Sequence, residues 1–285
     1  MDPGTHRPAG PRLVLNLLGA ALLVLLVACG GGGSSGGGEA SDPPATSASQ
    51  PTSASAAEHR TVTLDHGGFR LLYDCDERSA LRFEYRLEAD VGQLARADTF
   101  LLGDPLLPSG CAEQLRATSY ASVASGWDRG HLVAANHMDG SADWMNSAFY
   151  MTNIVPQRAA FNRGIWLQTE EISECYRDLA PVQVIGGLIF DDASNDVFVA
   201  SHGLRTPDWF WKVLITTDAS GAVQAQAWLM PNRDGLSGLD AYLVRLVDLE
   251  ARIGAQRLGL PALPEALRTA LPTRSWPLPA GCQLG

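Results

Sequence analysis

Residues 127–131 read Trp-Asp-Arg-Gly-His and bring an acid, a guanidinium and an imidazole together within a short stretch. Such a cluster can move a proton beside an anion. The imidazole of His131 accepts a proton near neutral pH, Arg129 can hold a phosphate oxygen, and Asp128 can fix a neighbouring group. Taken alone the cluster is weak, because a histidine beside an arginine is usually a surface or packing residue. It predicts a general base only if other polar residues converge on His131.

A second polar cluster follows at residues 150–170. It contains Asn153 in a Thr-Asn-Ile-Val-Pro-Gln segment, and then Asn162, Trp166 and Glu170. The last three have i, i+4, i+8 spacing and therefore lie along one strip of a helix. A separate strip is apolar and is formed by Ile165, Ile172, Tyr176 and Leu179. One face of this helix is expected to pack while another presents an amide and a carboxylate, although ordinary solvated helix residues would give the same pattern.

Together, the two clusters resemble those of the DNA/RNA non-specific endonuclease family, the ββα-metal nucleases. The resemblance covers most of residues 60–260, with motifs in the family's order. It implies an α+β fold with an antiparallel central sheet flanked by helices, and metal-dependent hydrolysis of phosphodiester bonds in DNA and RNA. His131 matches the family's general base, which deprotonates a water for in-line attack on phosphorus. Asn162 matches its direct ligand to Mg²⁺ or Mn²⁺, with waters completing the coordination shell.

The resemblance also implies roles for other polar residues. Glu170 matches an acid that holds a metal-bound water, and Asn153 matches an asparagine that orients the histidine or the loop around the metal. Asp128 and Arg129 match residues that fix the catalytic loop and contact the phosphate. A purely structural role remains open for each of them.

The Arg-Phe-Asp pattern ahead of the family's catalytic loop is matched by Arg96, Phe100 and Asp104. Arg96 is therefore expected to clamp the phosphate in the transition state, with an ordinary surface arginine as the alternative. The chain departs from the family pattern at Glu174, where some members carry an arginine. Arg177 could substitute for that arginine one turn later.

Alternating and β-branched runs separated by glycine, proline and aspartate predict strands, and longer periodic runs predict helices. Strands in sequential runs with helices inserted favour an α+β layered domain over a regular βαβ alternation. The predicted strands are 61–64, 69–73, 81–87, 149–153, 182–190, 209–216 and 223–230, and the predicted helices are 157–180, 239–253 and 264–269. The second polar cluster therefore spans one predicted strand and the first half of the longest predicted helix.

The start of the chain resembles a bacterial lipoprotein precursor. Arg7 and Arg12 precede an apolar run over residues 13–28, which is short for a membrane span but suits a signal-peptide core. The run ends in Leu-Val-Ala-Cys, which is similar to a lipobox and implies cleavage before Cys29 and lipid on its thiol. Because Gly30 follows, the resemblance implies an outer-membrane anchor. An ordinary cleaved signal peptide or an uncleaved anchor is the alternative.

Three segments follow from this composition. Residues 1–28 are the expected lipoprotein signal peptide, residues 29–59 a flexible tether rich in glycine, serine, alanine and proline, and residues 60–285 a single endonuclease domain. The domain holds four cysteines, so two disulfides are expected in an exported protein, with three connectivities open. A zinc site is not expected, because no cysteine has finger spacing and no third ligand clusters with the histidines. The four cysteines are Cys75, Cys111, Cys175 and Cys282.

The formal net charge of −10 argues against a broad nucleic-acid-binding surface. Lys212 is the only lysine, however, and the arginines that supply the remaining positive charge suit bidentate phosphate contacts. A metal-dependent nuclease needs only a local basic cleft. We therefore expect modest affinity for nucleic acid and sharp salt dependence.

The sequence as a whole predicts an exported, membrane-tethered endonuclease that acts on DNA and RNA with little sequence preference and requires no protein partner. A catalytically silent nucleic-acid-binding or structural lipoprotein is the alternative, against which the intact His131, Asn162 and Glu170 argue. A nuclease toxin delivered to competitors is a third reading. The lipobox and the lack of an obvious delivery domain argue against that reading.

Overall fold

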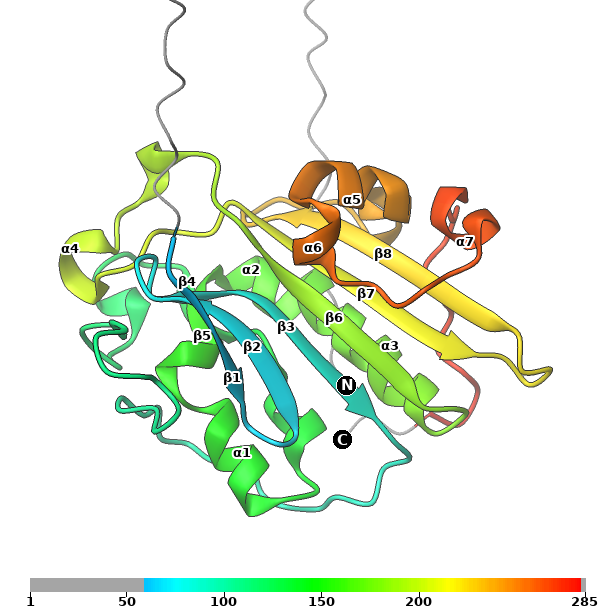
Figure 1. The fold of residues 1–285 in the computed structure, drawn as a ribbon, viewed down its shortest axis with the longest axis horizontal. Helices are drawn as coiled ribbons and strands as arrows, with labels where there is room; N and C mark the ends of the chain where they lie inside the picture. Colours follow the sequence, from blue (N-terminus) through cyan, green and yellow to red (C-terminus); the bar gives the residue numbers. More distant parts are fainter. Residues whose placement is uncertain (1–58, 283–285) are drawn as a thin grey trace, which may run out of the picture. The chain divides into compact units, whose positions relative to one another are not determined.

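A six-stranded antiparallel sheet forms the centre of the computed structural model, which describes residues 59–282 (Figure 1). The strands lie in the order β1-β2-β3-β6-β7-β8. They are β1 Thr61–Asp65, β2 Phe69–Asp74, β3 Ser79–Leu87, β6 Val182–Ile189, β7 Trp209–Thr217 and β8 Val223–Pro231. Each coincides with a predicted strand. The predicted α+β class with an antiparallel central sheet is therefore confirmed.

The predicted signal peptide 1–28, the lipidation site Cys29 and the tether up to residue 58 lie outside the described residues. The described residues, 59–282, belong to one compact unit. Within residues 59–282, none of the helices combines the length and apolar character needed to cross a membrane.

A separate two-stranded ribbon joins the two polar clusters. Its strands, β4 Trp127–His131 and β5 Ile154–Arg158, are antiparallel, with His131 opposite Ile154. The predicted strand at 149–153 was wrong, and β4 was not predicted. Residues up to Asn153 are held in a 3₁₀ turn in which the Asn153 N–H donates to the Tyr150 carbonyl at 2.9 Å, so the chain can join a ladder only from Ile154 onward.

The predicted helix over 157–180 is divided into three pieces. Its first two residues belong to β5, and the helical pieces are α2 Ala159–Phe161, the π-helical segment η4 Asn162–Trp166 and α3 Leu167–Arg177. The break lies at Gly164, whose φ of −112° and ψ of −113° are not helical. A π segment inside a helix often marks a functional site, because it changes the direction in which side chains point.

The predicted helix over 239–253 is also interrupted, because Leu243 forms a bridge to Trp228 of β8. The first part is the 3₁₀ turn η6 Leu239–Tyr242, and the second is α5 Leu246–Ile253. The helix predicted at 264–269 is present as α7 Glu265–Thr269. The other helical elements are η1 Tyr120–Ser122, η2 Ala135–Met138, α1 Ala142–Ala148, η3 Met151–Asn153, η5 Ala193–Asn195, α4 Val199–His202 and α6 Ala255–Leu258.

Helical layers cover both faces of the sheet, with α2 and α3 on one face and α5 and α6 on the other (Figure 1). Side chains of β7 pack against the helices on both faces of the sheet, because alternate side chains of a strand point to opposite faces. Phe210 packs in the core beneath α3 with Trp166, whereas Trp211 packs beneath α5 with Leu249. Lys212 follows in this alternation and points toward α3.

Residues 88–181 form one excursion between two neighbouring strands of the sheet. Strands β3 and β6 pair directly, and Leu87 lies opposite Val182 at the point where the chain leaves and re-enters the sheet. The excursion contains the β4-β5 ribbon and helices α1 to α3. Both polar clusters of the sequence lie within it.

Two disulfides tie the described residues together. Cys75 is bonded to Cys111, and Cys175 of α3 is bonded to Cys282, across sequence separations of 36 and 107 residues. This pairing is one of the three connectivities that the sequence left open. The second bond fastens the C-terminal segment to the helix that carries Glu170.

Candidate active site

The β4-β5 ribbon requires glycine at position 130 because the Gln157 side chain lies against it. A Cβ atom placed on Gly130 would lie 1.9 Å from Gln157 Oε1 and 2.4 Å from Gln157 Cγ, which is far inside van der Waals contact. Gln157 is fully buried, so it has little room to move away. The glycine of the Asp-Arg-Gly-His cluster therefore allows the two strands of the ribbon to approach each other.

His131 ends β4 in a pocket of aromatic rings. Its ring centroid lies 5.5 Å from that of Phe100 and 4.8 Å from that of Phe149. The residue is only 7% exposed, and its Nε2 atom has no hydrogen-bond partner among the described residues. Burial, assisted by the positive charges of Arg96 and Arg129, lowers the pKa of His131 to about 3. The imidazole is therefore neutral at physiological pH and free to accept a proton.

Two arginines lie over the same phenylalanine rings. The guanidinium carbon of Arg129 is 3.8 Å from the Phe100 ring centroid, and that of Arg96 is 5.6 Å from the Phe149 ring centroid. Arg129 also donates through Nη1 to the carbonyl of Ala117 at 2.8 Å, so part of its hydrogen-bonding capacity fixes a loop. Arg96 is exposed and makes no side-chain hydrogen bond within the described residues. Both guanidiniums are placed to attract an anion beside His131.

Asn153 holds the chain immediately after His131. Its Oδ1 accepts from the Val133 N–H at 3.0 Å, and its Nδ2 donates to the carbonyls of Val133 and Ala148 at 3.0 and 2.9 Å. Its own carbonyl accepts from the Leu132 N–H at 3.0 Å. The side chain is fully buried. Of the two roles that the resemblance left open, this geometry favours orientation of the loop.

Asn162, at the start of η4, reaches across to β4. Its Nδ2 donates to Asp128 Oδ2 at 3.0 Å, and Arg163 holds the same carboxylate through two donors at 2.9 and 2.7 Å. Asp128 therefore fixes the nitrogen side of the Asn162 amide. The Asn162 Oδ1 atom accepts no hydrogen bond from the described residues, which leaves an oxygen available to a cation.

Glu170 and Trp166 complete the other side of the site. The Trp166 indole N–H donates to the His131 carbonyl at 3.3 Å, so this fully buried residue belongs to the core and also supports the histidine. The Glu170 side chain is 15% exposed, and its Oε1 lies 4.0 Å from the Nζ atom of Lys212. Burial raises the pKa of Glu170 above its ordinary value, and the positive charges of Lys212, His137 and Arg96 offset only part of this rise. The candidate site thus contains an amide oxygen at Asn162, a carboxyl group at Glu170 and a neutral imidazole at His131.

Residues around His137 form a second buried network that does not converge on His131. His137 Nδ1 lies 2.9 Å from the Tyr85 hydroxyl, and its Nε2 lies 3.3 Å from Glu174 Oε2. Arg177 pairs with Glu174 and with Asp90. Arg177 is therefore held inside this network and is not positioned as a free phosphate ligand.

The part of the chain that the structure describes brings together one cluster of histidine and acidic side chains with metal-ligand spacing. It consists of His59, Asp74 and Asp76, and neither His131 nor His137 belongs to it. Asp104 is likewise committed elsewhere, because its carboxylate accepts from Thr152 at 2.5 Å and lies 3.3 Å from His66 Nε2.

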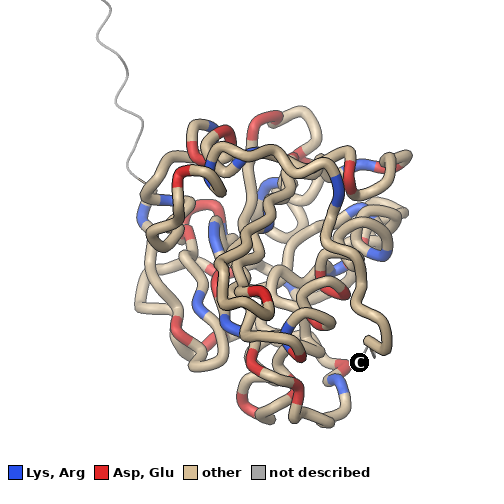
Figure 2. Tube along the Cα trace, turned by 90° about the vertical axis from the view of Figure 1, so that its right-hand side faces the viewer, with Lys and Arg blue, Asp and Glu red and all other residues tan. Residues whose placement is uncertain are grey.

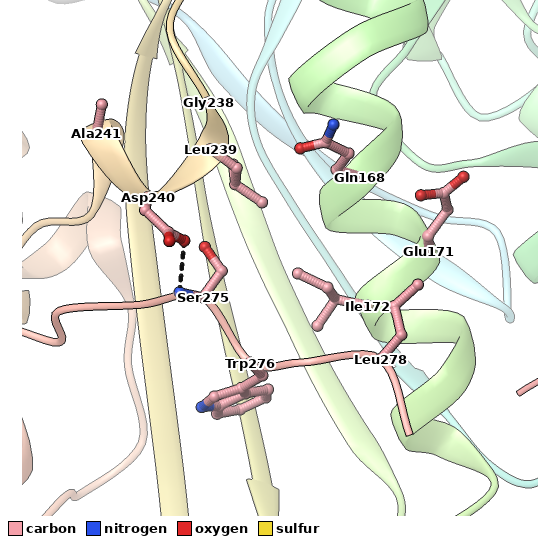
Figure 3. Close-up of a pocket in the computed structure, with 10 residues that line it drawn as sticks. All are labelled: Gln168, Glu171, Ile172, Gly238, Leu239, Asp240, Ala241, Ser275, Trp276 and Leu278. Atoms are coloured by element: carbon pink, nitrogen blue, oxygen red, sulfur yellow. Dashed lines mark hydrogen bonds between the residues drawn. The ribbon is translucent and has the colours of Figure 1, made fainter. Parts of the chain in front are cut away.

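A pocket of about 650 Å³ lies on the outer side of α3, away from these residues. Figure 3 shows Gln168 and Ile172 of α3 facing η6 and the C-terminal segment, where Asp240 accepts from the Ser275 N–H at 2.7 Å. None of the sequence-predicted site residues lines this pocket. A pocket of this volume therefore does not by itself mark the candidate active site.

Sequence reasoning missed Lys212 and Gln157 as neighbours of the site. A signal for Lys212 was present, because the only lysine of the chain stands within the apolar run Trp-Phe-Trp-Lys-Val-Leu-Ile. A charged residue at the centre of a buried strand needs a partner. Gln157 gave no such signal, because the register that places it against Gly130 depends on tertiary pairing.

Comparison with known proteins places the chain in a family. Residues 49–258 match the DNA/RNA non-specific endonuclease family. Human mitochondrial endonuclease G is 31% identical over 150 residues, which is 49% of this chain and 50% of that protein. The nuclease of Serratia marcescens is 25% identical over 181 residues, covering 60% of this chain and 66% of that protein.

A solved structure shares the fold of this chain. The crystal structure of the EndoG/EndoGI complex aligns with a TM-score of 0.55 and 21% identity, covering 66% of this chain and 82% of that chain. The match to human endonuclease G spans about half the length of that relative. The architecture is the ββα-metal nuclease fold that the sequence predicted. With a family match over most of its length, the chain belongs to the DNA/RNA non-specific endonucleases.

Proposed function

We propose that this protein is a metal-dependent endonuclease that hydrolyses phosphodiester bonds in DNA and RNA with little sequence preference. The observation that carries the proposal is the state of His131, which is buried and neutral, lies near the positive charges of Arg96 and Arg129, and has no hydrogen-bond partner at Nε2 among the described residues. Family membership supports the reaction class. A silent binding protein would have no need for a desolvated histidine without a hydrogen-bond partner.

His131 supplies the base in this proposal. Its Nε2 accepts a proton from the water that attacks phosphorus, while the Trp166 indole holds the His131 backbone carbonyl. A phosphodiester anion bound at Arg96 and Arg129 would offset the two positive charges that lower the pKa of the imidazole. Binding of substrate therefore raises the basicity of His131 toward the value at which proton transfer is efficient.

Asn162 and Glu170 fit a hard divalent cation such as Mg²⁺ or Mn²⁺. Asp128 holds the Asn162 nitrogen, and Asn162 Oδ1 accepts no hydrogen bond from residues 59–282. Glu170 adds a carboxyl group able to hold a coordinated water. A donor set of oxygens without thiolate suits these ions better than zinc. When bound, the cation supplies charge neutralisation at the phosphate and at the leaving 3′ oxygen.

The charge distribution agrees with local recognition of substrate. Basic and acidic residues are interspersed along the trace and are not segregated to separate halves (Figure 2). All but one of the 21 basic residues are arginines, and the formal net charge is −10. Arginine contacts close to the scissile phosphate would therefore supply most of the attraction, and affinity should fall steeply with salt.

Export and lipid attachment at Cys29 form a further part of the proposal, with anchoring of the protein to the bacterial outer membrane. The two disulfides support an oxidising compartment. Cell fractionation of wild type beside Cys29→Ser tests the anchor. Movement of Cys29→Ser from the membrane to the soluble fraction is the expected result, and an unchanged distribution would contradict lipid attachment.

The nuclease proposal is tested by digestion of plasmid DNA and of RNA with Mg²⁺ and with EDTA. Wild type is expected to cut both substrates only with metal. His131→Ala and Asn162→Ala are each expected to lose at least about two orders of magnitude in kcat. Wild type that is folded but inert with several divalent metals would refute the nuclease and favour the catalytically silent alternative.

A further inference from the structure

Lys212 occupies a position where an unpaired ammonium is costly. It lies at the middle of β7, is fully buried and is flanked on the same face by Phe210 and Leu214. Its Nζ atom has no hydrogen-bond partner among the described residues. A buried charge destabilises a fold unless other groups compensate it. Packing alone would be met better by an apolar side chain such as methionine.

Two residues of the candidate active site compensate this charge. The Nζ atom lies 3.6 Å from the centroid of the Trp166 ring, which is cation–π geometry, and 4.0 Å from Glu170 Oε1. Trp166 in turn donates its indole N–H to the His131 carbonyl. The ammonium therefore touches one residue on the metal side of the site and another that supports the base.

We propose that Lys212 is a positioning residue, whose buried ammonium fixes the Glu170 carboxylate and the Trp166 ring and so sets the spacing between the acid and the histidine. The chemical consequence rests on the proposed nuclease function. Lys212 does not reach the substrate. It acts from the sheet, beneath the excursion that carries the reacting groups.

The direction of the effect follows from burial. Without the ammonium, Glu170 is a largely buried carboxylate that has lost its nearest cation, and the simplest relief is rotation toward solvent. Such a rotation removes the carboxylate from its place beside the site. Trp166, still packed against Phe210 at a centroid distance of 5.3 Å, would remain in the core. We therefore expect displacement of the Glu170 carboxylate to cause the decrease in kcat of the Lys212→Met variant.

A double-mutant cycle in kcat tests this route, using Lys212→Met, Glu170→Gln and the double variant with plasmid DNA. Lys212→Met is expected to lower kcat by about tenfold or more, the usual effect of losing a residue that orients an active-site ligand, with KM changed by less than about twofold. The kcat of the double variant is expected to match that of Glu170→Gln within about twofold. In Glu170→Gln the carboxylate that Lys212 positions is already absent, so loss of Lys212 has little further effect. Independent multiplication of the two effects, or an unchanged kcat in folded Lys212→Met, would overturn the proposal.

Leu214→Ala is the matched control, because Leu214 is equally buried on the same strand and face. Leu214→Ala should lower the urea unfolding midpoint. If it also lowers kcat, the fold-loss in kcat of Leu214→Ala combined with Glu170→Gln should be the product of the two single fold-losses. A control that showed the same dependence on Glu170 as Lys212→Met would point to general loosening of the strand, and would overturn the specific role of the ammonium.

Unfolding in urea with EDTA gives a second readout that needs neither metal nor activity. Each single variant leaves one buried charge uncompensated. The decrease in the urea unfolding midpoint should therefore be smaller for the double variant than the sum of the decreases for the two single variants. If Lys212→Met alone does not fold, the double variant should recover folding, and failure to recover would overturn the pairing. Inert wild type would refute the nuclease proposal separately, while this cycle would still test the pair.

Discussion

Replacement of Asn153 by alanine is the sharpest test of how the base is held. The side chain makes three hydrogen bonds at 2.9–3.0 Å in a fully buried position, one to the N–H of Val133 and two to carbonyls. Loss of a partner leaves a buried polar group unsatisfied at about 1–3 kcal/mol each. Three such groups sum to roughly 3–9 kcal/mol, and water that enters the space brings the loss toward the lower end of this range. Since domains are stable by about 5–15 kcal/mol, the variant should fold but be markedly weakened.

Urea unfolding and steady-state nuclease kinetics would measure the two consequences of Asn153→Ala separately. Because Val133 lies two residues after His131, kcat should fall by about tenfold or more at urea concentrations and temperatures where the variant is still folded. A variant within about 1 kcal/mol of wild type, or one that is destabilised but keeps kcat within about twofold, would refute the reasoning.

Asn232→Ala provides the matched control. Asn232 also donates two hydrogen bonds, to the carbonyls of Pro156 and Pro207, and accepts one, from the Arg158 N–H. It is only partly buried, and none of these three hydrogen bonds involves residues 131–133. Water can therefore replace its bonds, and both the stability loss and the kcat loss should be smaller than for Asn153→Ala.

Further changes test other features of the structure. With a His131 pKa of about 3 in the folded state and 6.5 as the ordinary value, the unfolded state binds more protons between these values. Stability should therefore fall as pH drops from 6.5 toward 3, and His131→Gln should flatten that slope by up to about 1.4 kcal/mol per pH unit in urea titrations; equal slopes would contradict the buried neutral imidazole. Gly130→Ala should cost about 1–3 kcal/mol through its clash with Gln157, and Gln157→Ala added to it should recover part of the loss; additive losses would exclude the clash. Replacement of Cys175 and Cys282 by serine should lower stability about 1 kcal/mol more than replacement of Cys75 and Cys111 by serine, because the Cys175–Cys282 bond closes a longer loop. Chemical unfolding of the two double variants measures the difference. The reverse order of stability losses would contradict the loop-closure explanation.

The sequence was informative wherever the determining contacts are local or periodic. All six strands of the main sheet follow from alternation and turn residues. His131 and Asn162 stood out through the resemblance of their surrounding motifs. The ribbon strand β4 could not be found this way, because its five residues are mostly polar or glycine and form a strand only by pairing with β5.

The helix after Pro156 shows the complementary failure. A regular helix would place Asn162, Trp166 and Glu170 on one strip, and the sequence carries no direct signal for a π segment at Gly164. In the structure Trp166 is fully buried, whereas Asn162 and Glu170 remain partly accessible. Contacts between layers decide this difference, and Lys212 on a distant strand is one of them. Such contacts depend on sheet register and on the kink together, which single-sequence periodicity does not specify.

The pairing of Leu87 with Val182 separates the residues of the candidate active site from the strands of the main sheet along the chain. Between these two neighbours, residues 88–181 carry the candidate base, the amide ligand and the carboxylate, while the strands on either side form a frame that is complete without them. Insertions or deletions in the loops of the excursion can therefore change the surroundings of the candidate active site without shifting the register of any strand pair in the six-stranded sheet. The frame is not passive, because Lys212 projects from it into the excursion. The loops of the excursion can thus vary in length, whereas position 212 must keep a residue that compensates the Glu170 carboxylate.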